Sequence, residues 1–143
     1  MTKLITDYSA GMVATVNEDG SPAVSPKATF VVLDEATIAF GNIRSPGTVK
    51  NLRRDPSVEV CFIDVVLRKA VRVKGKAVVE RKGRIDEPTM SAFEASWAPY
   101  LPHMSDIVTI HLSAAEIILS PAYDVGFSEA DLRETNLKKL NAL

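Results

Sequence analysis

The segment 70–80 alternates between apolar and charged side chains, and this pattern constrains the fold more than any other feature of the chain. Four apolar residues share one face of an extended strand and four charged residues share the other: Val71, Val73, Ala77 and Val79 against Arg72, Lys74, Lys76 and Glu80. A period of two is typical of a strand with one buried and one solvated face. The chain must therefore supply further strands that bury the apolar face.

Five other segments have the β-branched and apolar composition of strands: 11–17, 25–32, 37–43, 58–66 and 106–119. A tight hairpin is favoured by Asp19-Gly20, and Asp34-Glu35 turns the chain between the next two strands. The first three segments are therefore predicted to form an antiparallel meander. Six strands with few helices predict a mainly β fold, a six-stranded antiparallel β-barrel with short helices, whose closure removes exposed sheet edges.

Three helices are predicted from their end signals. Ser45 and Pro46 are typical of the first positions of a helix, and Asp55-Pro56 ends that helix. A second helix is predicted over 87–97, and a third over 128–140 with Ser128 as its cap. The first helix follows the strand 37–43 directly, so a strand end leads into a helix N-terminus.

Length and charge limit the classes of function. The chain has 143 residues, is 46% hydrophobic and has no segment of linker composition, so we expect a single domain over 1–143. Its formal net charge of -1 gives no general attraction to nucleic acid or anionic lipid. No apolar run reaches the ~18–20 residues of a membrane span. We therefore expect a cytoplasmic protein with no nucleic-acid partner and no membrane partner.

The chain has too few cysteine and histidine residues for a disulfide or a zinc site. Cys61 is the single cysteine, so no intrachain disulfide forms, and its apolar neighbours predict a buried structural thiol. The two histidines, His103 and His111, are far apart and do not suggest a zinc site. We expect no metal.

The junction between the strand 37–43 and the first helix is a candidate anion site. Free N–H groups and the helix dipole favour an anion at a helix N-terminus. Arg44 precedes the cap, Gly47 permits close approach to the backbone, and Thr48 and Lys50 offer a hydroxyl and a charge. An ordinary capped helix with solvated basic side chains is the alternative interpretation.

Lys27 favours the anion site over that alternative. It lies on the polar face of the predicted strand 25–32, which is expected to neighbour the strand 37–43. Lys27 and Arg44 are therefore expected to converge on one anion. Two cations together with helix N–H groups suit a phosphate monoester.

Several motifs in this order resemble the pyridoxamine 5'-phosphate oxidase-like FMN-binding split barrels. The motifs are Ala14-Thr-Val-Asn-Glu-Asp-Gly-Ser-Pro22, Ser25-Pro-Lys27, Ile38-Ala-Phe-Gly-Asn42, Asn51-Leu-Arg-Arg-Asp-Pro56 and Val58-Glu-Val60. The segment Ser120-Pro-Ala-Tyr-Asp124 is similar to that of short flavin-nucleotide-binding members.

The resemblance implies a homodimer that binds FMN in grooves at the subunit interface, with the tail 121–143 placed to contact the partner subunit. It also implies which residues surround the cofactor. By motif position these are Ser25, Pro26, Lys27 and Ala28 on the second strand, Gly41, Asn42 and Arg44 at the end of the third, and Thr48, Lys50 and Asn51 on the phosphate helix.

The implied activity is that of an FMN-dependent oxidoreductase, which passes a hydride or electrons between a nicotinamide donor and a small organic acceptor. Because the cofactor carries such chemistry, no acid–base pair is required, and no catalytic residue is assigned. A non-catalytic flavin-binding or storage protein would have the same phosphate site, and F420-dependent reductases share the fold. Both alternatives stay open. The ending 137–143 lacks the basic segment of pyridoxamine phosphate oxidases, so that substrate is not expected.

Overall fold

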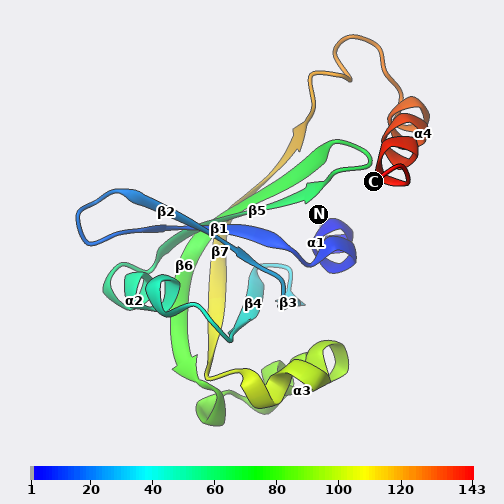
Figure 1. The fold of residues 1–143 in the computed structure, drawn as a ribbon. Helices are drawn as coiled ribbons and strands as arrows, with labels where there is room; N and C mark the ends of the chain where they lie inside the picture. Colours follow the sequence, from blue (N-terminus) through cyan, green and yellow to red (C-terminus); the bar gives the residue numbers. More distant parts are fainter. Residues whose placement is uncertain (1) are drawn as a thin grey trace.

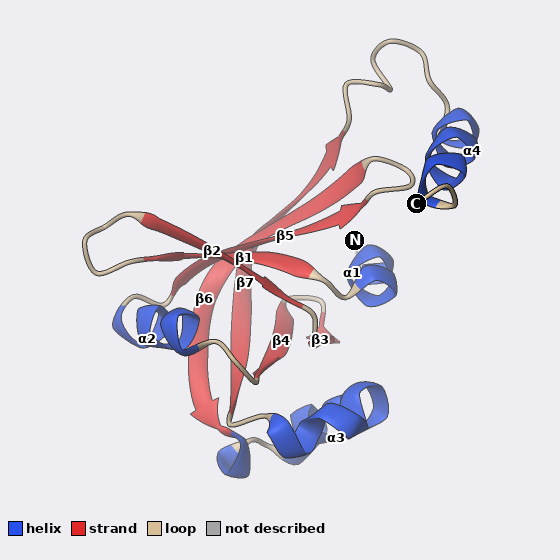
Figure 2. Ribbon diagram, in the orientation of Figure 1, coloured by secondary structure: helices blue, strands red, loops and turns tan. Residues whose placement is uncertain are grey.

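A computed structural model describes residues 2–143, and their strands form one antiparallel sheet (Figures 1 and 2). The strands are β1 (Gly11–Val16), β2 (Pro22–Lys27), β3 (Phe30–Asp34), β4 (Thr37–Asn42), β5 (Ser57–Asp64), β6 (Lys69–Arg81) and β7 (Asp106–Leu119). They are hydrogen-bonded in the order β2-β1-β5-β6-β7-β4-β3. The mainly β, split-barrel fold class is confirmed.

The predicted strand 25–32 is two strands, which raises the strand number among the described residues from the predicted six to seven. β2 pairs with β1 and β3 pairs with β4, so both predicted antiparallel pairings form, but the prediction of one continuous middle strand is wrong. Pro22 and Pro26 have no N–H to donate, which suits β2 to a sheet edge. β2 and β3 are the two edges of the sheet, and only Ala28-Thr29 separates them in the chain. The sheet therefore curves until its edges lie close together at this connection.

The main core lies inside the curved sheet. The Phe30 ring contacts those of Phe62 and Phe40, with centroids 4.8 Å and 5.3 Å apart. Gly11 faces the same cluster, and a Cβ there would come within 3 Å of Val60, Phe62 and Phe30. A larger residue at the start of β1 would therefore push these rings apart. The alternation predicted over 70–80 is confirmed, because the apolar side of β6 faces this core and the charged side faces solvent.

The predicted helices are confirmed as α2 (Pro46–Arg54), α3 (Glu87–Trp97) and α4 (Glu129–Leu140). A further helix, α1 (Thr2–Tyr8), and two short 3-10 helices, η1 (Lys82–Arg84) and η2 (Ala98–His103), were not predicted. α2 packs on β1 and β6, whereas α3 covers β3 and forms a second, smaller core around Phe93, Met104 and Ile107. No helix within residues 2–143 is long and apolar enough to cross a membrane.

Cys61 is half-buried rather than buried, which corrects the prediction of a core thiol. The pleat of β5 directs Val60 and Phe62 inward, and Cys61 lies on the outer face in register with Met12 and Arg72. The apolar run around the cysteine concealed this alternation.

The C-terminal segment packs against the hairpin between β5 and β6 of its own chain (Figure 1). The Tyr123 hydroxyl donates to the Leu67 carbonyl at 2.6 Å, and Asn136 Nδ2 donates to the Val66 carbonyl at 2.8 Å. Ser128 and Asp131 form a capping box at the start of α4.

Candidate functional site

The site begins where β4 leads into α2. Asn42 ends β4, and its side-chain Oδ1 accepts from the Ser45 N–H at 3.0 Å. Ser45 is the N-cap but makes no side-chain capping bond, and Pro46 has no N–H. Nothing lies within 4 Å of the point where a Cβ on Gly47 would stand. The N–H groups of the first turn therefore lack a side-chain cap, and the positive end of the helix is open to an anion.

Lys27 is a buried cation at the end of β2. It is 9% exposed, and its Nζ donates to Ser25 Oγ and to the Pro26 carbonyl, the latter at 3.2 Å. Within residues 2–143 no carboxylate lies within 4 Å of this ammonium. Desolvation lowers the pKa of Lys27. A buried charge is costly unless it is paired, so this lysine is suited to bind an anionic ligand.

Thr29 joins the Lys27 segment to the end of β4. Its hydroxyl accepts from the Gly41 N–H and donates to the Gly41 carbonyl, both at 3.0 Å. Gly41 is itself closely packed, because a Cβ there would overlap Met104. The structure thus brings the end of β2 next to the end of β4, although these strands do not pair.

The other residues of the predicted site have different surroundings. Asn51 is buried, and its Nδ2 donates to Thr15 Oγ1 at 3.1 Å and to Asn17 Oδ1 at 3.0 Å, so it anchors α2 to β1. Lys50 faces Glu18 of the β1–β2 hairpin, with 3.5 Å between Nζ and Oε2. Arg44 is exposed in the loop before α2.

The remaining predicted residues lie close to these in the chain. Pro26 and Ala28 are exposed on either side of Lys27, and Thr48 is buried in the first turn of α2.

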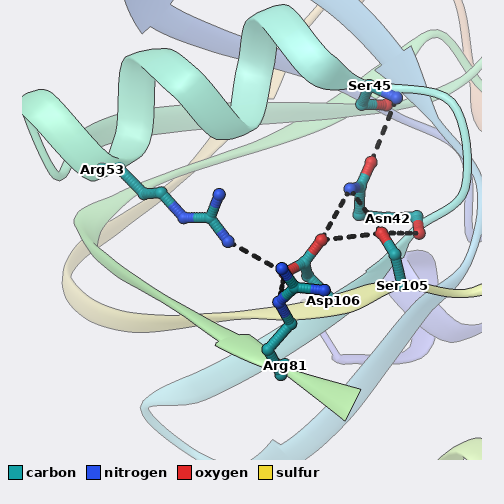
Figure 3. A network of polar contacts seen from close by, with 6 residues as sticks. All are labelled: Asn42, Ser45, Arg53, Arg81, Ser105 and Asp106. Carbon is teal, nitrogen blue, oxygen red and sulfur yellow. Dashed lines mark hydrogen bonds and ion pairs between the residues drawn. The ribbon is translucent and has the colours of Figure 1, made fainter.

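Asp106 was not among the residues predicted from the sequence, and it lies directly beneath the β4–α2 junction (Figure 3). Its Oδ2 accepts from Ser105 Oγ at 2.7 Å and from Asn42 Nδ2 at 3.1 Å. Its Oδ1 accepts from Arg53 Nη2 at 2.9 Å and lies 3.9 Å from Arg81 Nε.

The hydrogen bond from Ser105, followed by that from Asn42 and the charges of both arginines, holds the pKa of Asp106 below its usual range. In the sequence, Asp106 appears only as a single acidic residue before an apolar strand. Its partner Asn42 is 64 positions away, so local patterns could not reveal the pair.

A hollow of about 470 Å³ lies elsewhere, between α3 and the strands β3, β4, β6 and β7. It contains no residue of the predicted site, and Asp34, Glu80 and Asp86 line it. Three carboxylates repel an anion, so this hollow is a poor phosphate site.

Comparison with known proteins assigns the chain to a family. The family model described as pyridoxamine 5'-phosphate oxidase matches residues 1–120. The chain therefore belongs to the pyridoxamine 5'-phosphate oxidase family. No curated protein matches the chain.

Solved structures share the fold. HupZ of Group A Streptococcus superposes with a TM-score of 0.67 at 24% identity, over 84% of this chain and 92% of that one. An FMN-binding protein from Syntrophomonas wolfei superposes with a TM-score of 0.67 at 11% identity, over 83% and 84%. A protein described as F420 reductase superposes with a TM-score of 0.63 at 18% identity, over 80% and 94%. At these identities the likeness concerns the fold.

Proposed function

We propose that this protein binds FMN and acts as an oxidoreductase that passes a hydride or electrons from a nicotinamide donor to a small organic acceptor. The observation that carries the proposal is the buried ammonium of Lys27, which has no carboxylate partner among residues 2–143. Two residues further along the chain, Thr29 bonds to the end of β4, which leads into the uncapped helix α2. This arrangement supplies positive charge and N–H donors, and the Asp106 carboxylate beneath the junction is paired with Arg53, which suits the site to the phosphate dianion of FMN.

The site offers the kinds of group that bind FMN. The first turn of α2, with open space at Gly47, offers backbone donors to the phosphate. Lys27 offers a cation, and the neighbouring residues Pro26 and Ala28 are exposed. When bound, the flavin ring supplies the two-electron chemistry. The role of this chain is then to hold and orient the cofactor.

We also propose that the functional unit is a homodimer in the cytoplasm, with the cofactor at the interface. The second half of β7 supports this proposal, because each of the residues 113–119 is exposed. Ile117 and Leu119 lie on one face and Ile118 on the other, in register with Ala70 and Ile63. A second copy would cover such an apolar surface. The tail 121–143, held on the β5–β6 hairpin, would then reach the partner subunit.

The test is reconstitution followed by reduction. Purified protein is titrated with FMN, and separately with F420, while absorbance and fluorescence are recorded. We expect FMN to bind, and the yellow complex to bleach when NADH or NADPH is added without oxygen.

Each other result changes the conclusion in a defined way. A complex that stays oxidised with both donors indicates a flavin-binding or storage protein. Preference for F420 over FMN indicates a reductase dependent on that cofactor. Failure to bind either cofactor contradicts the proposal.

A further inference from the structure

The side-chain amide of Asn42 has one orientation available, and Asp106 determines it. A carboxylate only accepts hydrogen bonds, so the Nδ2 group of Asn42 must face Asp106 Oδ2, from which it lies 3.1 Å. The Oδ1 of Asn42 then faces the Ser45 N–H at 3.0 Å. The charge on Asp106 is thus connected, through one amide, to the backbone at the N-cap of α2 (Figure 3).

The same carboxylate also holds the other end of α2. Arg53 belongs to the last turn of this helix, and its Nη2 lies 2.9 Å from Asp106 Oδ1. Figure 3 shows Arg53 and Ser45 at opposite ends of the helix, both connected to Asp106, the latter through Asn42. A helix held at both ends cannot rotate or slide freely on β1.

A negative charge close to an anion site would be unfavourable if it faced the anion. Both oxygens of Asp106 are occupied by protein donors, and the side chain is 9% exposed. Arg53 and Arg81 compensate its charge. Asp106 is therefore built to organise the junction rather than to touch a ligand.

We propose that Asp106 is a positioning residue for the cofactor phosphate: by fixing the amide of Asn42, it fixes the N–H groups at the start of α2 that bind this phosphate. The inference rests on the proposed FMN function and adds a residue that acts through Asn42.

The test compares FMN with riboflavin, which has the same ring but no phosphate. In Asp106→Asn the new amide presents either a donor or an acceptor to Asn42, so the orientation of Asn42 is no longer fixed. We expect FMN affinity to fall about tenfold, the equivalent of one net hydrogen bond. Riboflavin affinity is expected to stay within about twofold, because no phosphate contact is involved.

Ser105→Ala is the matched control. It removes the hydroxyl that donates to Asp106 and accepts from Asn42 Nδ2 at 3.1 Å, but leaves the carboxylate that orients the Asn42 amide. We expect its ratio of FMN to riboflavin affinity to equal that of the wild type. Should Asp106→Asn not fold, Asp106→Glu replaces it, because Glu keeps the charge opposite Arg53 and Arg81 but displaces the acceptor from Asn42.

The outcomes distinguish the positioning role of Asp106 from FMN binding itself. An unchanged ratio in the Asp106 variant, or an equal loss in Ser105→Ala, overturns the positioning role and leaves FMN binding intact. A wild-type protein that binds no FMN overturns the proposed function and this inference with it.

Discussion

At the scale of single residues, Lys27 combines a cost to the stability of the fold with a proposed role in binding the phosphate. A buried ammonium that donates only to a hydroxyl and a carbonyl is poorly compensated. The proposed phosphate ligand would supply the missing charge. Removal of its charge should therefore lower the affinity for an anion without lowering the stability of the free protein.

Lys27→Met preserves much of the side-chain volume and removes the charge. We expect FMN affinity to fall about 10- to 150-fold, the equivalent of a charge-assisted hydrogen bond. The free energy of unfolding of the FMN-free protein should stay constant or rise by up to about 1 kcal/mol. Isothermal titration and urea unfolding measure the two effects. Lys76→Met, on the exposed face of β6, is the control and should change neither.

The pH dependence of stability gives an independent check on Lys27. Its pKa is lower in the folded protein than the ordinary value of 10.5, so between these two values the unfolded chain binds more protons. The contribution of Lys27 to the free energy of unfolding therefore rises as the pH increases from the folded to the unfolded pKa. Below the folded pKa, the full cost of burying the ammonium remains. The wild type should gain stability relative to Lys27→Met as the pH approaches 10.5. Parallel pH profiles of the two proteins would contradict this account.

How much of the site the sequence predicts depends on whether the signal is local. The strand–helix junction, the proline at the start of α2 and the polar position of Lys27 are all visible within a few residues. The buried carboxylate of Asp106 and the Thr29–Gly41 contact are not, because they arise from strands that meet only in the folded sheet.

At the scale of elements, local patterns predict where strands lie better than how they pair. The polar and apolar positions of 25–32 suit one strand, yet the chain changes neighbours at Ala28-Thr29. Pairing partners are set by the curvature of the whole sheet, which has no signature within one strand. The β6–β7 pair shows the same limitation, since its register shifts between Lys74 and Gly75 while the alternation of β6 continues unbroken.

Gly75 should be essential to the register shift between β6 and β7. A Cβ at this position would overlap the His111 carbonyl, and a backbone group of the neighbouring strand cannot move away without loss of ladder hydrogen bonds. We expect Gly75→Ala to lower the free energy of unfolding by about 2–3 kcal/mol. Gly83→Ala, where nothing lies within 4 Å, should change it by less than about 0.5 kcal/mol. Equal denaturation midpoints for the two variants would show that the register shift does not depend on glycine.

At the scale of the whole molecule, the half of β7 beyond Leu112 exposes apolar side chains that the proposed homodimer would cover. The half of β7 nearest the barrel is mostly buried, whereas the half beyond Leu112 is exposed. Ala70 of β6 pairs with Ile63 of β5 on one side and with Ile118 of β7 on the other. Ile63 and Ile118 lie on the outer face and are 47% and 36% exposed. Composition alone does not separate apolar residues of the core from those of an interface, so only the folded structure identifies this surface.

Ile118→Glu tests whether a second copy covers this surface. The residue is already partly exposed, so the folded subunit should tolerate the substitution, whereas a two-fold interface would bury the new charge twice. We expect the wild type to sediment as a dimer, and the variant to weaken dimerisation by at least about 30-fold, the equivalent of ~2 kcal/mol.

Because the cofactor is proposed to lie between the subunits, FMN retention should fall as Ile118→Glu dissociates. Val78→Glu, an exposed apolar position on β6 beyond the register shift, is the control and should remain dimeric. A monomeric wild type that binds FMN would remove the dimer from the proposed function. A dimer unaffected by Ile118→Glu would place the interface on another face.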